Sequence, residues 1–182
     1  MAMLGSTSIS SPATVGEPWI SLRKPTDADG AAVSRLIDEC PPLDRNSRYC
    51  NLLQCTDFAD TCIVAERDDE IVGWISGYRL PNERGTLFVW QVAVHPDARG
   101  KGLGKRMLHA LLDRAARSGV ESMRTTVTRS NTASRTLFRS VANRIGSPMR
   151  ERPHFHANTH FAGDQETEYL IEIGRFPNPA TR

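Results

Sequence analysis

The segment Gln91–Arg106, QVAVHPDARGKGLGKR, decides the fold. It begins inside an almost wholly apolar run, 87–94 (LFVWQVAV), whose composition predicts a central strand covered on both faces. Pro96 and Asp97 then break the strand, and the pattern R-x-x-G-x-G follows as the chain enters a helix. A strand that runs through a glycine-rich turn into a helix is typical of a ligand loop in an α/β domain.

The start of this helix is predicted to hold a pyrophosphate. Backbone N–H groups there have no partner within the helix and lie at the positive end of its dipole, while glycines let the backbone approach an anion closely. Two of the three lysines of the chain also lie in this loop. The predicted cofactor contacts in the loop are Arg99, Gly100, Lys101, Gly102, Leu103, Gly104 and Lys105.

Other phosphate-binding loops fit the segment poorly. The pattern G-x-x-x-x-G-K-[ST] is absent, and the G-x-G-x-x-G loop of dinucleotide-binding folds would follow the first strand rather than the fourth. A glycine-rich turn that only starts a helix remains an alternative, although it does not account for the basic side chains gathered there.

Hydrophobic periodicity around the loop predicts a single α/β (α+β) domain with a mixed sheet and helices on both faces. We expect the domain to span 19–176, after a disordered tail at 1–18 that is rich in Ser, Thr, Gly and Pro, and before a short tail at 177–182. The second helix is expected to turn Tyr49, Leu52 and Leu53 inward. The predicted elements are strand 19–23, a helix between Thr26 and Pro41, helix 46–55, strands 62–66, 71–78 and 87–94, helix 102–118 ending at Gly119, strand 123–127, helix 131–141 and strand 169–173.

Composition excludes several classes of protein. The net charge is +2 and the basic residues are spread along the chain, which argues against a nucleic-acid partner. No run approaches the ~20 apolar residues that a membrane-spanning helix needs. The four cysteines have no metal-ligand spacing, so we expect no metal, and without a visible export signal we expect a cytoplasmic protein.

At the R-x-x-G-x-G loop the chain resembles the GNAT acetyltransferases, whose Q/R-x-x-G-x-G/A loop binds the pyrophosphate of acetyl-CoA. Asn131, Ser134, Leu137 and Phe138 also resemble the helix that flanks the pantetheine arm in that family. The resemblance covers roughly 19–174 and implies a sheet whose central strands splay at the cofactor, with acetyl-CoA as acetyl donor. It implies contacts from Asn131 and Phe138 to the cofactor. Many members have Tyr where Phe138 stands, so Phe138 departs from the family as a proton donor; its alternative role is packing.

The same resemblance assigns the strand before the loop a catalytic part. It implies that the Val94 N–H polarises the thioester carbonyl and that Val92 touches the pantetheine. A donor aimed at a developing oxyanion is worth about 3 kcal/mol, so main-chain geometry matters here more than any one side chain.

A narrower resemblance concerns the amine that is acetylated. The segments 42–53 (PLDRNSRYCNLL), 88–94 and 168–170 resemble the L-2,4-diaminobutyrate acetyltransferases of ectoine biosynthesis, a compatible-solute pathway. This implies acetyl transfer to the 4-amino group of a small diamino acid, and a homodimer. Other readings stay open: a GNAT enzyme for another small amine or a peptide N-terminus, and a non-catalytic acyl-CoA sensor.

A diamino acid needs carboxylates for its ammonium groups and a cationic or amide donor for its carboxylate. One ammonium must also lose its proton before attack, because an alkylammonium has no lone pair. We take Val94, Glu168 and Tyr49 as candidate catalytic residues and expect direct attack without an acyl-enzyme. The proton acceptor is left open, with His154, His156 and His160 as further candidates or as an ordinary polar loop. The predicted substrate contacts are Asp44, Arg45, Asn46, Tyr49, Trp90 and Glu168.

Three of these residues have simpler roles as alternatives. Asp44 precedes a helix and is a common type of helix cap. Trp90 is equally suited to core packing, and Glu168 to a solvated strand edge.

Overall fold

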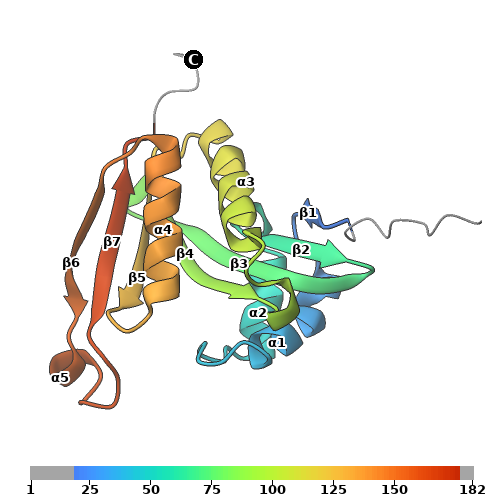
Figure 1. Cartoon of the computed structure of the whole chain (residues 1–182), viewed down its shortest axis with the longest axis horizontal. Coiled ribbons are helices and arrows are strands. Elements are labelled where there is room, and N and C mark those ends of the chain that lie inside the picture. Colours follow the sequence, from blue (N-terminus) through green and yellow to red (C-terminus); the bar gives the residue numbers. More distant parts are fainter. Residues whose placement is uncertain (1–18, 177–182) are drawn as a thin grey trace, which may run out of the picture.

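The structure, a computed structural model, describes residues 19–176 (Figure 1). The tails predicted at 1–18 and 177–182 therefore lie outside the described residues. The strands are β1 (Ser21–Arg23), β2 (Ile63–Arg67), β3 (Glu70–Leu80), β4 (Glu83–Val94), β5 (Ser122–Thr128), β6 (Met149–Phe155) and β7 (Glu168–Gly174). The helices are α1 (Gly30–Asp38), α2 (Arg48–Cys55), α3 (Leu103–Arg117), α4 (Thr132–Ile145) and α5 (Ala157–His160), with 3-10 turns at Asp27–Asp29, Ala59–Thr61 and Pro96–Ala98.

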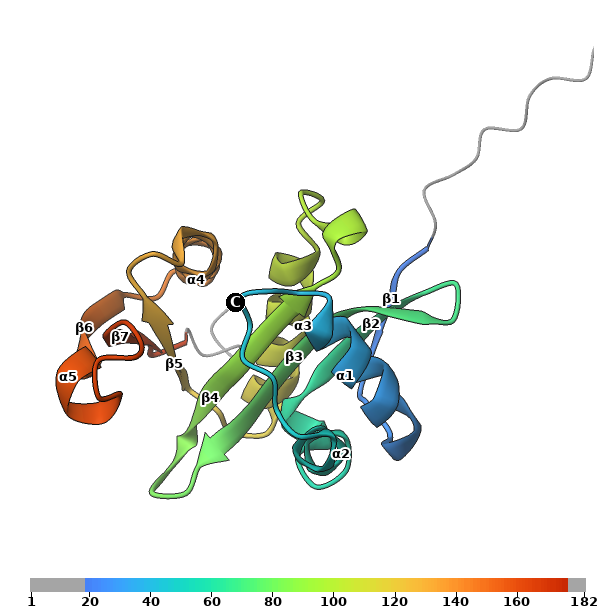
Figure 2. The same ribbon diagram turned by 90° about the horizontal axis from the view of Figure 1, so that it is seen from below.

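One mixed sheet organises the chain, as predicted. Its order is β1-β2-β3-β4-β5-β7-β6, with β4 in the middle. Among the strands of residues 19–176, β4 and β5 pair in parallel, and the other neighbours are antiparallel. Figure 2 shows α1 and α2 on the near side of β3 and β4, with α3 behind these strands. The sheet thus separates two cores, one under α3 and α4 and one under α1 and α2.

Helix α3 is the element whose sequence predicts it best. Six apolar residues at helical spacing in the sequence predict this helix, and they are the six buried residues of α3: Leu103, Met107, Leu108, Leu111, Leu112 and Ala115. Gly119, with φ of 87°, follows the helix in the left-handed conformation that suits a C-terminal cap. Because α3 is fixed to the sheet along its whole inner face, its first turn is held rigidly at the end of β4.

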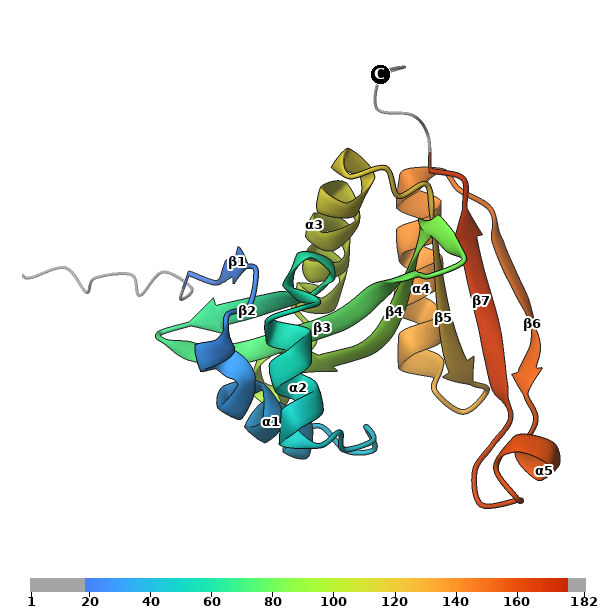
Figure 3. The same ribbon diagram turned by 180° about the vertical axis from the view of Figure 1, so that it is seen from behind.

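The central parallel pair is short and then opens. β4 and β5 are paired only at Thr86↔Ser122, Leu87↔Met123 and Phe88↔Arg124, although β4 continues to Val94 and β5 to Thr128. Figure 3 shows the two strands diverging beyond this point. The splayed central pair that the family resemblance implied is therefore present, and it leaves one edge of β4 without a strand partner.

Two sequence-based expectations about burial were wrong. β4 is not covered on both faces, because Trp90 is 50% exposed and Val92 and Val94 are only half-buried. These three residues lie on the part of β4 that no longer pairs with β5. Helix α2 does not turn Tyr49 inward: this ring is 70% exposed, and the buried face of α2 carries Asn51, Gln54 and Cys55 instead.

The sequence reading also missed β6 and α5. Both lie in the His-containing stretch that was expected to be irregular. β6 is an edge strand, and five of its seven residues are exposed, so it has no apolar alternation to detect. Pro153 also argues against a strand in a sequence, yet an edge strand tolerates proline.

Candidate active site

The loop between β4 and α3 has the geometry of an anion cradle. Gly100 and Gly102 adopt positive φ values of 77° and 72°, and a Cβ at either position would meet nothing within 4 Å. Gly102 is the N-cap of α3, and the first helical hydrogen bond runs from the Arg106 N–H to its carbonyl. The N–H groups of Leu103, Gly104 and Lys105 therefore have no helical acceptor.

The side chains of the loop divide into anchors and exposed groups. Ala98 and Leu103 are buried and hold the loop against the core. Arg99 is exposed, and its Nε donates to the Val94 carbonyl at 2.9 Å, so it ties the loop back to the end of β4. Lys101 is also exposed and Lys105 is half-buried. This arrangement fits a pyrophosphate held by backbone amides with basic side chains around it.

The main-chain groups of Val92 and Val94 point away from β3. The His95 N–H donates to the Val72 carbonyl at 2.9 Å, so these two residues form a hydrogen-bonded pair that extends the β3–β4 ladder. Such pairs alternate with non-hydrogen-bonded pairs in an antiparallel ladder, and the register is unbroken from Val94 back to Gln91. The N–H groups of Val92 and Val94 therefore face the gap that β5 has left.

Helix α4 borders the same gap. Asn131 caps the helix by accepting a hydrogen bond from the Ser134 N–H on its Oδ1 at 3.0 Å. Leu137 lies over Gly104, where an added Cβ would be 3.7 Å from its side chain. Phe138 is only 2% exposed and belongs to the core under α3 and α4, which leaves it almost no surface for a cofactor.

Phe138 gives a first testable prediction, on stability. Truncation of Phe138 to Ala should lower the free energy of unfolding by about 3–5 kcal/mol, because a buried aromatic ring leaves a cavity. Urea unfolding monitored by circular dichroism measures this loss. Phe138→Leu keeps most of the volume and serves as the control, with a loss well below that of Phe138→Ala. Equal stability of Phe138→Ala and the wild type would contradict a packing role.

On the opposite side of the sheet, an irregular segment before α2 brings two predicted substrate residues, Asp44 and Asn46, into contact with Gln91 of β4. The Asp44 carbonyl accepts from Gln91 Nε2 at 2.8 Å, and Asn46 Nδ2 donates to Gln91 Oε1 at 3.2 Å. Asp44 leaves its carboxylate exposed, and it does not cap α2, because that part is played by Ser47. Arg45 is 75% exposed and pairs with Asp38 at 2.9 Å, so it points away from this contact.

Trp90 lies at a β-bulge on the rim of the splay. The β3 partner of Gln91 is Ser76 and that of Val89 is Gly77, so Trp90 is the extra residue of the bulged strand. Its ring is half exposed and meets Tyr78 edge-on, with the ring centroids 6.3 Å apart. Trp90 is therefore a surface residue beside the gap, not a core residue, and it offers an aromatic face to a cationic group.

Glu168 is the first residue of β7, opposite Thr128 of β5. Its Oε2 atom is buried and has no hydrogen-bond partner within residues 19–176. Burial raises the pKa of this carboxyl above its ordinary value; the Thr126 hydroxyl offsets the shift in part, while Asp44 and Glu166 add to it by repulsion. The Asp44 carboxylate is therefore close enough to Glu168 to repel it. A cationic amine bound near both groups would relieve this repulsion.

The remaining candidates form no hydrogen bond or ion pair with these residues in the described part of the chain. Tyr49 is exposed at the first turn of α2 and makes no side-chain hydrogen bond or ring contact there, so its catalytic and substrate roles stay predictions. His154, His156 and His160 cluster with Phe155 on β6 and α5, where the His156 and His160 rings stack at 6.0 Å. Burial lowers the pKa of His154, which keeps its ring neutral near pH 7.

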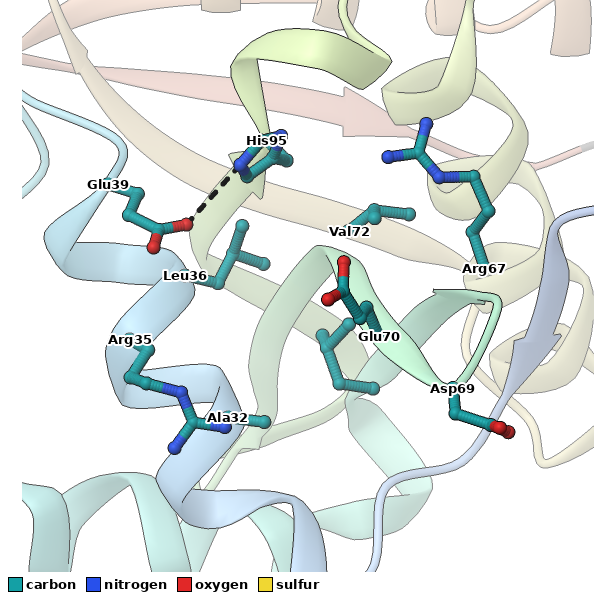
Figure 4. Close-up of a pocket in the computed structure, with 10 residues that line it drawn as sticks. Ala32, Arg35, Leu36, Glu39, Arg67, Asp69, Glu70, Val72 and His95 are labelled. Atoms are coloured by element: carbon teal, nitrogen blue, oxygen red, sulfur yellow. Dashed lines mark ion pairs between the residues drawn. The ribbon is translucent and has the colours of Figure 1, made fainter. Parts of the chain in front are cut away.

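A separate groove of about 240 Å³ opens between α1 and the β2–β3 turn (Figure 4). His95 and Glu39 meet on one wall, with Nε2 and Oε2 3.4 Å apart, while Arg67 and Asp69 come from the turn. Leu36 forms part of its lining. None of the predicted site residues lines this groove, so it is distinct from the splay.

Sequence reasoning overlooked Gln91 as a site residue. It is 7% exposed and contacts both Asp44 and Asn46. The signal was available, because an amide in the middle of LFVWQVAV has to find partners for its donor and acceptor. Cys40 was also overlooked: its Sγ lies 3.3 Å from the Val94 carbonyl as a donor.

Within residues 19–176 there is no cluster of three side chains able to hold a metal ion, and the four cysteines there are free thiols. None of the helices in this part of the chain has the length and apolar character to cross a membrane.

Comparison with known proteins agrees with this geometry. The model of the acetyltransferase (GNAT) family matches residues 31–142. The chain is 47% identical over 159 residues to an L-2,4-diaminobutyric acid acetyltransferase of Methylotuvimicrobium alcaliphilum, covering 87% of this chain and 92% of the relative. It is 45% identical to the protein of the same name in Vibrio cholerae, covering 86% and 90%.

A solved structure is also similar over most of the chain. Diaminobutyrate acetyltransferase EctA from Paenibacillus lautus, in complex with its substrate L-2,4-diaminobutyric acid and coenzyme A, has a TM-score of 0.84 and 41% identity. The match covers 88% of this chain and 98% of that one. The family model, the relatives and the splayed sheet with its glycine loop agree: the chain belongs to the GNAT acetyltransferase family.

Proposed function

We propose that the protein transfers the acetyl group of acetyl-CoA to the 4-amino group of L-2,4-diaminobutyrate, giving N4-acetyl-L-2,4-diaminobutyrate and CoA. The observation that carries the proposal is the Glu168 carboxyl, whose Oε2 is buried without a hydrogen-bond partner in the described residues and which lies close enough to the Asp44 carboxylate to be repelled by it. The names of the relatives support the same substrate.

The acetyl donor would enter from the α3 side. The free amides of the α3 N-terminus and the basic side chains of the loop suit its pyrophosphate, and the gap between β4 and β5 suits its pantetheine arm. The N–H of Val94 faces this gap, so it is placed to donate to the carbonyl oxygen as negative charge develops there.

The acceptor amine would enter from the α2 side. Asp44 and Trp90 supply a carboxylate and an aromatic face for one ammonium group. Glu168 is half-buried and its Oε2 has no hydrogen-bond partner in the described residues, while its raised pKa makes it a better proton acceptor than an ordinary carboxylate, so we assign to it the proton of the attacking amine. The nitrogen then attacks the thioester carbon, and the C–S bond breaks to release the CoA thiolate.

Two further proposals rest on the family resemblance: a homodimer, and a place in ectoine synthesis during osmotic stress. A cytoplasmic location stays a prediction from the sequence.

A thiol-release assay with acetyl-CoA and a panel of amines tests the proposed substrate. We expect turnover with L-2,4-diaminobutyrate and little with 1,3-diaminopropane, which has both amines at the same spacing and no carboxylate. Asp44→Asn should raise the KM for diaminobutyrate about tenfold, because one charge-assisted contact of roughly 1.5 kcal/mol is lost. Turnover of peptide N-termini in preference to diaminobutyrate would overturn the proposal.

A further inference from the structure

The segment between α1 and α2 carries substrate residues but has little structure of its own. Residues 43–47 form neither helix nor strand, and Asp44 and Arg45 are exposed. The ion pair of Arg45 with Asp38 joins two well-exposed side chains, and such pairs contribute little. An exposed, irregular segment of this kind would leave the Asp44 carboxylate free to move over several ångströms unless something fastens it to the sheet.

Gln91 is the residue that fastens it. Its Nε2 donates to the Asp44 carbonyl and its Oε1 accepts from Asn46, so the two ends of one amide hold two residues of the segment. Among the hydrogen bonds found for residues 19–176, these are the two that join the stretch 44–46 to the sheet. Because Gln91 is buried on a central strand, its own position is rigid.

The bulge in β4 sets the direction of this amide. Trp90 and Gln91 together stand opposite Ser76 of β3, so the extra residue changes the alternation of side chains along the strand. Gln91 is then buried against the 44–46 segment, while its neighbour Trp90 stays half exposed at the splay. One backbone irregularity therefore positions two parts of the acceptor pocket at once.

We propose that Gln91 is a positioning residue for the acceptor amine: it fixes the Asp44–Asn46 segment at a set distance from Glu168 without touching the substrate itself. The inference rests on the proposed function and deepens it. A diamino acid places its two cationic groups at a fixed spacing, so a pocket that reads this spacing needs both carboxylates held in place.

The test compares Gln91→Met with Gln54→Met. Both substitutions remove an amide of the same size from a buried site, but Gln54, 3% exposed on α2, makes no hydrogen bond through either amide atom within the described residues. We expect Gln91→Met to raise the KM for diaminobutyrate about tenfold, the effect of two neutral hydrogen bonds, with the KM for acetyl-CoA within about twofold of the wild type. Gln54→Met should leave both constants within about twofold.

Asn46→Ala removes one of the two bonds from the segment side and leaves β4 intact, so it tests the idea even if Gln91→Met folds poorly. If Asn46 acts through Gln91, the two substitutions will not add: Asn46→Ala will have no further effect on the KM for diaminobutyrate in the Gln91→Met background. Full additivity would overturn the coupling.

The proposed function and the positioning role can fail separately. A wild-type protein that does not acetylate diaminobutyrate refutes the function. A wild-type protein that does so, together with a Gln91→Met variant of unchanged KM for the amine, refutes the positioning role alone. An equal rise in the KM for acetyl-CoA, or an equal effect of Gln54→Met, would show that Gln91 only supports the fold.

Discussion

Replacing Gly102 with Val is expected to raise the Kd for CoA about a hundredfold, which corresponds to about 2.7 kcal/mol. Gly102 has φ of 72° at the N-cap of α3, and a β-branched residue is a strong outlier in this region. Forcing the backbone out of it costs about 1–3 kcal/mol and turns the free amides of Leu103, Gly104 and Lys105 away from the anion. Isothermal titration calorimetry with CoA measures the change.

Gly146→Val is the matched control for this experiment. Gly146 has φ of 70°, a Cβ there would also meet nothing within 4 Å, and it caps the far end of α4. Both variants should lose similar stability, because they suffer the same backbone strain. Only Gly102→Val should lose affinity for CoA; a normal Kd in a folded Gly102→Val variant would show that the coenzyme binds elsewhere.

The elements around this loop were predictable because their sequence signals are local. The apolar stripe of α3, its glycine cap and the breaker residues after β4 each follow from spacing along the chain, and the structure reproduces them. Of the two glycines of the R-x-x-G-x-G pattern, Gly102 has a positive φ, whereas Gly104 lies in the first turn of α3; Gly100, between Arg99 and Gly102, also has a positive φ. A cofactor half-site made of consecutive residues can therefore be read from one segment.

The acceptor half of the site could not be read in the same way, because its members meet only through tertiary packing. Asp44 and Glu168 are far apart in sequence, and their mutual repulsion depends on how β5 and β7 diverge from β4. Tyr49 was placed inward by helical periodicity, yet the buried face of α2 is polar and carries Asn51 and Gln54. The periodicity of apolar residues assigns the wrong buried face to a helix whose inner face carries amide side chains.

Glu168→Gln is expected to reduce kcat with diaminobutyrate by on the order of a thousandfold, because a general base contributes about 10²–10⁴ and an amide cannot accept the proton of the amine. Glu166→Gln, on the exposed loop just before β7, is the matched control and should keep nearly full activity. The thiol-release assay across a range of pH measures both. A kcat for Glu168→Gln close to that of the wild type would remove Glu168 from catalysis and leave water or another group as proton acceptor.

The same substitution should make the free protein more stable at neutral pH. Burial raises the pKa of Glu168 in the folded state, so its neutral form is favoured there, and its contribution to stability is present at low pH and is lost as pH rises through the folded pKa. Gln has no such titration. The difference in unfolding free energy between Glu168→Gln and the wild type should therefore be small below pH 4.5, the ordinary value for this carboxyl, and should grow above it. Thermal unfolding from pH 4 to 8 without ligand measures this difference.

Bound diaminobutyrate should stabilise the wild type more than it stabilises Glu168→Gln. Its ammonium offers the charged Glu168 and Asp44 the partner that they lack, so saturating substrate should raise the Tm of the wild type more than that of Glu168→Gln. A variant that is more stable when empty, less stabilised by substrate and nearly inactive is the signature of a site that keeps an unpaired carboxylate for binding and proton transfer. If the substrate stabilises both proteins equally, Glu168 does not meet the amine.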